Sequence, residues 1–128
     1  MMLYLQDLDI SVFGAEELLQ WAEQSPQEGP RTLSRLCGVT GPNLSPLARE
    51  LLVRYGKDKR VRSNLAANFT SGIHMGSTTY WLQAKVQIAK AWADDPHPNV
   101  RLWANELVRS LEQEIVHWRQ WEEEEGLP

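Results

Sequence analysis

The sequence contains little that would support a disulfide, a metal site or a membrane span. Cys37 is the only cysteine among the 128 residues, so no internal disulfide can form, and a reducing compartment is expected. The three histidines lack the H-E-x-x-H and H-x-x-x-H spacings of metal sites. No window approaches the roughly 20 apolar residues that cross a bilayer, and the first residues lack the features of a signal peptide. These absences predict a cytoplasmic, soluble protein with no cofactor.

The charge balance argues against general affinity for nucleic acid or for an anionic membrane. The formal net charge is −4, whereas both targets require a surplus of lysine and arginine. One segment is locally basic, and its cations are Arg54, Lys57, Lys59, Arg60 and Arg62. A solvated helix–turn surface is the simpler interpretation of this segment. Nucleic-acid binding through it remains an alternative hypothesis.

No residue set has the pattern of an enzyme active site. The G-x-S-x-G setting of a nucleophilic serine is missing, and the glycines around His74 follow no predicted strand. Lys57 follows a glycine, but Asp58 comes next, which is not the pattern of a phosphate-binding loop. We therefore expect a non-catalytic protein with no catalytic, cofactor-binding or metal-binding residues. His74 would be the first residue to test if an activity were found.

Apolar periodicity and helix punctuation predict an all-α domain of about six helices, of which the last is the longest. Ser45 and Ser77 have the position and chemistry of N-caps, and Asp58 is placed to cap a further helix. His97, in the turn before the last helix, is expected to be solvated or to cap. The expected helices cover residues 15–23, 30–37, 46–55, 59–69, 77–93 and 99–125.

The expected helix over residues 77–93 is apolar on two sides. One stripe consists of Trp81, Ala84, Ile88 and Ala91, and the other consists of Leu82, Val86, Ala89 and Ala93. A helix with two apolar stripes is typical of an element packed between neighbours. We therefore expect this helix to be central and the most buried element of the fold.

The last helix is expected to extend past its partner. At 1.5 Å per residue it would be roughly 40 Å long, against about 25 Å for residues 77–93. Val116, Trp118 and Trp121 would then lie beyond the partner helix, and the glutamates of residues 122–125 would fray into a tail. An exposed tryptophan is a typical anchor of an interface. These three apolar residues are the candidate protein interface.

Two turns of the sequence share a Val-Arg pair that follows an aspartate. The pairs are 39 residues apart, close to the period of roughly 40 to 47 residues in two-helix repeats. The residues expected to build these turns are Asp58, Val61, Arg62, Asp95, Val100 and Arg101. At these residues the chain resembles the HEAT-repeat family of helical repeats, which includes the related armadillo type.

The resemblance implies a stack of antiparallel helical hairpins within a single domain over residues 1–128. An N-terminal arm of residues 1–14 would precede a divergent first hairpin over 15–43 and HEAT-like hairpins over 44–71 and 77–125. Such proteins carry no common catalytic residues and act as scaffolds in most settings. The expected function is therefore protein–protein interaction, as an adaptor or as the end of a larger repeat protein. A homodimer through the C-terminal helix is one form that the partner could take.

Overall fold

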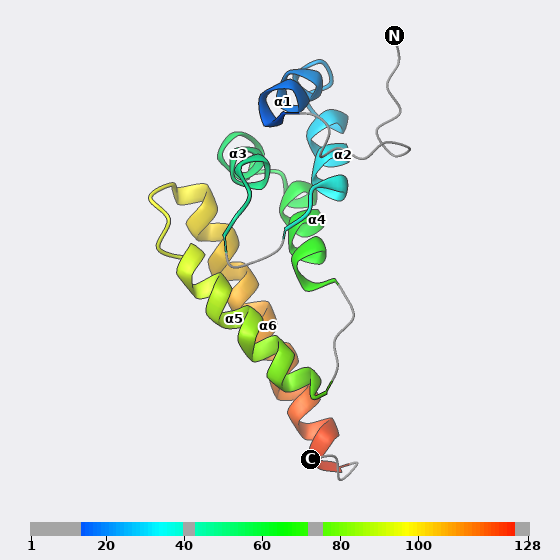
Figure 1. The fold of residues 1–128 in the computed structure, drawn as a ribbon, viewed down its shortest axis with the longest axis vertical. Helices are drawn as coiled ribbons and strands as arrows, with labels where there is room; N and C mark the ends of the chain where they lie inside the picture. The colour runs from blue at the N-terminus through cyan, green and yellow to red at the C-terminus, as the bar shows by residue number, and fades with distance from the viewer. Residues whose placement is uncertain (1–13, 40–42, 72–75, 125–128) are drawn as a thin grey trace. The chain divides into compact units, whose positions relative to one another are not determined.

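The computed structural model describes residues 14–39, 43–71 and 76–124, and these residues form helices and no strand. The helices are α1 (Ala15–Glu23), α2 (Glu28–Leu36), α3 (Pro46–Tyr55), α4 (Lys59–Thr70), α5 (Thr78–Trp92) and α6 (Pro98–Glu124) (Figure 1). The all-α class, the six helices and the position of the longest helix at the C-terminal end confirm the expectation. The predicted arm lies outside the described residues except for its last residue, and His74 lies outside them too.

Short-range side-chain contacts set where several helices begin. The Oγ atoms of Ser45 and Ser77 each accept a 3.3 Å hydrogen bond from the backbone N–H three residues later. Asp58 Oδ1 accepts a 2.9 Å bond from the N–H two residues later, at the start of α4. His97 Nδ1 accepts a 3.1 Å bond from the N–H two residues later, in the first turn of α6. The predicted caps are therefore confirmed, and His97 is one of them.

The chain divides into two compact units, Met1–Phe69 and Thr70–Pro128. In the first unit α1 packs against α2 and α3, and α2 also packs against α3. The buried apolar residues of α1 to α4 are Leu18, Leu19, Ala22, Leu33, Ala48, Leu51, Leu52, Val61, Leu65 and Phe69. The single-domain organisation expected from the sequence stays a prediction.

Helices α1 and α2 approach each other closely at Gly29. A Cβ atom at this position would lie 2.5 Å from the backbone oxygen of Ala22 and 2.6 Å from its Cα. The backbone N–H of Gly29 donates a 2.7 Å hydrogen bond to the carbonyl of Ser25 in the preceding turn. Because any side chain would collide with backbone rather than with a movable side chain, glycine is required for this packing.

The second unit is a hairpin in which α5 packs along α6 (Figure 1). Its buried apolar residues are Leu82, Val86, Ala89, Trp92, Val100, Trp103, Ala104, Leu107, Leu111 and Ile115. The indole rings of Trp92 and Trp103 stack with centroids 5.6 Å apart near the turn of the hairpin. The two helices thus share one apolar seam that is dominated by branched aliphatic residues and closed by an aromatic pair.

The expectation that α5 is the most buried element is wrong, because only one of its two apolar stripes is covered. The stripe with Leu82 and Val86 faces α6 and is buried. On the other stripe Ala84 and Ala91 are exposed, and Trp81 is half-buried. Both stripes are apolar in sequence, but a two-helix hairpin can cover only the face that meets the other helix.

Candidate interaction surfaces

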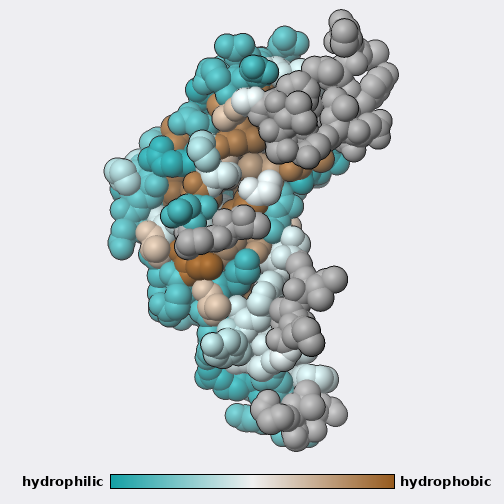
Figure 2. Space-filling model, in the orientation of Figure 1, coloured by the Kyte–Doolittle hydropathy of each residue, from teal (hydrophilic) through white to brown (hydrophobic). Residues whose placement is uncertain are grey.

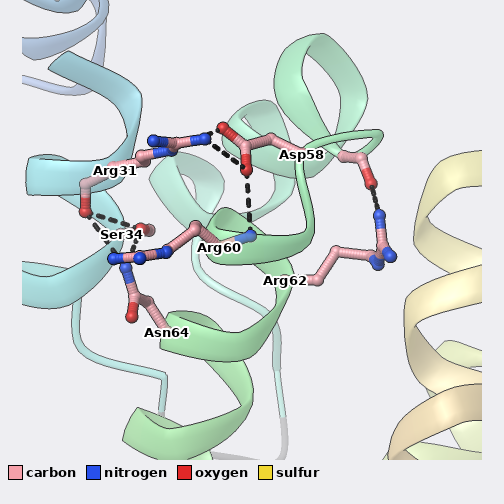
Figure 3. Close-up of polar contacts among 7 residues, drawn as sticks. Arg31, Ser34, Asp58, Arg60, Arg62 and Asn64 are labelled. Carbon is pink, nitrogen blue, oxygen red and sulfur yellow. Dashed lines mark hydrogen bonds and ion pairs between the residues drawn. The ribbon is translucent and has the colours of Figure 1, made fainter. Parts of the chain in front are cut away.

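The two Val-Arg turns have the same arginine geometry. Arg62 Nη1 donates a 2.8 Å hydrogen bond to the carbonyl of Gly56, six residues earlier (Figure 3). Arg101 Nη1 donates a 3.0 Å bond to the carbonyl of Asp95, which is also six residues earlier, and a 2.8 Å bond to the carbonyl of Pro96. In both turns the guanidinium therefore satisfies backbone carbonyls of the turn that follows the preceding helix.

The valines of the two turns also match, whereas the aspartates do not. Val61 and Val100 are both 0% exposed. Asp58 and Asp95 each accept a 2.9 Å bond from the N–H two residues later. However, Asp58 lies four residues before its arginine and Asp95 lies six residues before its own. The repeated part of the motif is thus the buried valine and the carbonyl-binding arginine.

Asp58 also forms an ion pair with Arg31 of α2. Arg31 Nε lies 2.9 Å from Asp58 Oδ2, and the two side chains are 28% and 24% exposed (Figure 3). Burial alone would raise the pKa of the Asp58 carboxyl. The hydrogen bond and charge of Arg31, together with hydrogen bonds from the backbone N–H groups of Arg60 and Val61, outweigh burial and hold that pKa below its usual value. The carboxylate therefore joins α2 to the start of α4 while it caps α4.

Sequence reasoning missed a set of asparagine contacts between α4 and α2. Asn64 Nδ2 donates to Ser34 Oγ at 3.0 Å and to the carbonyl of Arg31 at 3.3 Å (Figure 3). Asn68 Nδ2 lies 2.8 Å from the carbonyls of Ser34 and Cys37. One amide thus serves the free carbonyls at the end of α2. The four-residue spacing of the two asparagines was the available signal, because it places both on one face of α4.

The five cations of the predicted basic patch differ in their surroundings. Arg54 of α3 lies 3.2 Å from Glu50, 3.4 Å from Glu23 and 3.8 Å from Glu16, so acidic residues of α1 and α3 surround it. Arg62 is engaged by the backbone of its own turn, as described above.

The other three cations of the predicted patch remain on the surface. Lys57, Lys59 and Arg60 are exposed around the turn between α3 and α4. The ion pairs of Arg54 weaken the case for nucleic-acid binding, because electrostatic affinity grows with the number of phosphates contacted.

The three candidate interface residues differ in their surroundings. Val116 is 57% exposed and Trp121 is 42% exposed, whereas Trp118 is half-buried. The Trp118 ring meets the ring of Trp121 edge to face at a centroid distance of 5.4 Å, and it meets His117 in the same manner at 5.9 Å. The C-terminal part of α6 therefore presents an ordered aromatic edge, and Trp121 is its most accessible indole.

The expected overrun of α6 at its C-terminal end is wrong. Ser77 Oγ donates a 2.8 Å hydrogen bond to Glu122 Oε1, and the Thr79 N–H lies 3.5 Å from the same oxygen. The start of α5 therefore lies level with Glu122 rather than several turns short of it. The turn over residues 93–97 rises past the last turn of α5, so α6 begins beyond the end of α5 (Figure 1).

The same contact shows that Glu122 belongs to the ordered helix and not to a frayed tail. The hydrogen bond from Ser77 is the main cause that lowers the pKa of the Glu122 carboxyl, with further bonds from residues 78 and 79. A carboxylate at the N-terminal end of α5 is also favoured by the helix dipole. The charge of Glu122 is therefore used to close the open end of the hairpin.

The chemistry of metal binding and of thiols gives no further candidate. Among residues 14–39, 43–71 and 76–124, no group of three His, Cys, Asp or Glu side chains could hold a metal ion. Burial raises the pKa of the Cys37 thiol, although a contact with Ser45 partly opposes this. A buried thiol with a raised pKa is a poor nucleophile.

No helix in the described part of the chain combines the length and the apolar character needed to cross a membrane.

The protein was also compared with family models, with curated proteins and with solved structures. None of these comparisons found a match for the chain.

Proposed function

We propose that this protein is a non-catalytic scaffold that binds a protein partner through the aromatic edge at Val116, Trp118 and Trp121. The observation that carries the proposal is the 42% exposure of Trp121 on a helix whose position is fixed by the Ser77–Glu122 bond. Ordered, accessible tryptophans are enriched among residues that dominate binding energy. A rigid helix also presents such a residue without a large ordering cost.

The proposal includes a HEAT-like arrangement of hairpins in a cytoplasmic protein. Its support is the arginine of each Val-Arg turn, which binds a carbonyl six residues earlier, next to a buried valine. Repeats of this kind stack because one hairpin cannot bury both of its faces. The stripe of α5 that holds Ala84 and Ala91 is such an uncovered face. The protein then acts as an adaptor or as the end of a longer array.

Affinity capture from the native cell extract tests this function. The tagged protein is compared with Trp121→Ala, with Trp118→Ala plus Trp121→Ala, and with Tyr80→Ala. Tyr80 is 76% exposed on α5, so it controls for loss of an exposed aromatic residue. Truncation of a hot-spot tryptophan costs about 2 kcal/mol, which is a loss of binding of about 30-fold. Partners that Tyr80→Ala retains and Trp121→Ala loses support the proposal. Equal capture by all variants, with unchanged circular dichroism, rejects it.

Nucleic-acid binding is the second candidate function, favoured by the exposure of Lys57, Lys59 and Arg60 in one turn. Three phosphate contacts on duplex DNA predict a slope of about −3 in a plot of log affinity against log salt. Fluorescence anisotropy with labelled duplex and single-stranded oligonucleotides, at about 50 mM salt and above, measures this slope. The triple alanine variant at these positions should then lose all binding. Absence of binding at the lowest salt eliminates this candidate.

A further inference from the structure

The outer face of α6 carries a stripe of five exposed residues. They are Arg109, Glu112, Val116, Arg119 and Glu123, and Val116 is 57% exposed at the centre. Their steps of three and four residues keep them on one side of a helix. The stripe borders the buried seam with α5, and Trp121 lies outside the stripe. On the side shown in Figure 2, mostly hydrophilic and neutral residues form the surface where the N-terminal half of α5 and the C-terminal half of α6 lie.

The charges of this outer stripe reverse sign about Val116. Arg109 lies seven residues before Val116 and Glu123 lies seven residues after it, while Glu112 lies four residues before and Arg119 three residues after. A second α6 that runs antiparallel, with Val116 against Val116, thus places Arg109 opposite Glu123, and it places Glu112 within one residue of the level of Arg119. A parallel second helix in the same register would place like charges together instead.

The four charged groups of the outer stripe are available for such pairing. Within residues 14–39, 43–71 and 76–124, no hydrogen bond or ion pair engages the side chain of any of them. In contrast, Arg31, Arg54 and Glu122 are all held by contacts within the chain. These charges have no partners within the described part of the chain. When a second α6 runs in the opposite direction, each charge meets one of opposite sign. Such a surface suits contact with a second copy of the chain.

A groove beside the stripe gives the second copy a place to pack. Its volume is about 300 Å³. It lies between α5 and α6 and is lined by Gln83, Val86, Gln87, Glu112, Ile115, Val116 and Arg119. The floor is therefore aliphatic, and the rim carries amides and charges of both signs. An approaching valine and arginine from an antiparallel helix match this floor and rim in chemistry.

We infer that the partner of this surface is a second copy of the chain, held by an antiparallel α6–α6 contact centred on Val116. The inference deepens the proposed function, on which it rests, by naming one partner of the scaffold. Symmetry doubles each pairing, so Arg109–Glu123 and Glu112–Arg119 each occur twice. Exposed ion pairs contribute little individually and are screened by salt. The dimer therefore forms at high protein concentration and weakens as salt is added.

Charge reversal at Glu112 and Arg119, the pair nearer to Val116, tests the antiparallel α6–α6 contact. Sedimentation velocity of the purified full chain, over concentrations up to about 1 mM at low salt, measures association. Glu112→Arg alone and Arg119→Glu alone should each remain monomeric, because each places like charges together. The chain with both substitutions should dimerise again, since the pairing is restored with the signs exchanged. An equimolar mixture of the two single variants should form a heterodimer.

Glu114→Arg is the matched control, because it changes the charge by the same amount on another, exposed face of α6. It should dimerise like the unaltered chain. A monomeric unaltered chain throughout the concentration series overturns the inference. Dimerisation of either single variant, or failure of the double variant to recover, overturns the pairing. The extract capture is tested at Trp121, which lies outside the stripe, so it can succeed or fail independently of this result.

Discussion

Ser77 Oγ and Glu122 Oε1 are joined by a 2.8 Å hydrogen bond that ties the first turn of α5 to the last turns of α6. The hairpin of the second unit is therefore closed at both ends, by this bond at one end and by the stacked Trp92 and Trp103 at the other. Because α6 is held at this point, the orientation of Trp121 relative to α5 is defined. The surface proposed for partner binding depends on this closure.

Glu122→Gln should lower the melting temperature at neutral pH and remove part of its pH dependence. The pKa of Glu122 is lowered in the folded protein, so its contribution is present above the ordinary glutamate pKa and is lost as pH falls through the lowered value. Thermal unfolding of variant and unaltered chain should therefore differ at neutral pH and converge in acid. Glu124→Gln removes an exposed charge two residues away, and it should leave the melting temperature unchanged at neutral pH and in acid. A constant difference at every pH would show that the charge of Glu122 is not involved.

Gly29→Ala should destabilise the first unit by about 1 to 3 kcal/mol, the usual cost of overpacking. The new Cβ would lie 2.5 Å from the backbone oxygen of Ala22, so α1 and α2 must separate. Gly38→Ala is the matched control, because no heavy atom lies within 4 Å of its added Cβ. Urea unfolding of both variants provides the comparison. Equal stability of the two variants would contradict the close approach of α1 and α2.

Asn68→Asp should cost more stability than Asn68→Ala. The amide of Asn68 donates to the carbonyls of Ser34 and Cys37 at 2.8 Å, so alanine loses hydrogen bonds worth about 1 to 2 kcal/mol. Aspartate would additionally place a negative charge against the carbonyl end of α2, which the helix dipole disfavours. Chemical denaturation measures both changes, and Asn105→Asp, at an exposed position of α6, controls for the added charge. If Asn68→Ala cost more stability than Asn68→Asp, the role of Asn68 as a hydrogen-bond donor to these carbonyls would be contradicted.

Asp58→Ala should destabilise the protein by about 1 kcal/mol more than Arg31→Ala, because it removes a helix cap as well as an ion pair. A double-mutant cycle should give a coupling of about 0.5 to 1 kcal/mol, the upper part of the range for partly exposed pairs. Since the pKa of Asp58 is lowered in the folded protein, this coupling is present above the ordinary aspartate pKa. It should vanish as pH falls through the lowered folded value. A coupling that persists in acid would exclude an ionic origin.

Much of the local structure was predictable because its causes lie within a few residues. Ser45, Asp58 and Ser77 each bond to a backbone N–H two or three residues away, so their capping roles can be read from the chain. The buried seam of α6 follows from its apolar period, and the Val-Arg turns follow from a recurring dipeptide. The hydrogen bonds of the two arginines were not predicted, but the carbonyls that Arg62 and Arg101 bind lie within six residues of each arginine.

Contacts between distant residues could not be predicted in the same way. The approach of Glu16 and Glu23 to Arg54 depends on how α1 lies against α3, so a run of basic residues in sequence was a poor guide to free charge. Helix lengths alone predict that the C-terminal end of α6 extends past α5. They do not show how far the turn over residues 93–97 shifts the register of α6 against α5. That register is set by the apolar seam and by Ser77 meeting Glu122.

The sequence by itself determined that the chain is helical, where most of its helices begin, and which face of α6 is apolar. The reason is that caps, turns and periodicity act over one or two helical turns. Only the tertiary structure decided which apolar stripe of α5 is covered, which of the charged residues are paired, and that Trp121 lies exposed beside an ordered hairpin end. These properties depend on which surfaces meet, and residues distant in sequence supply the partners.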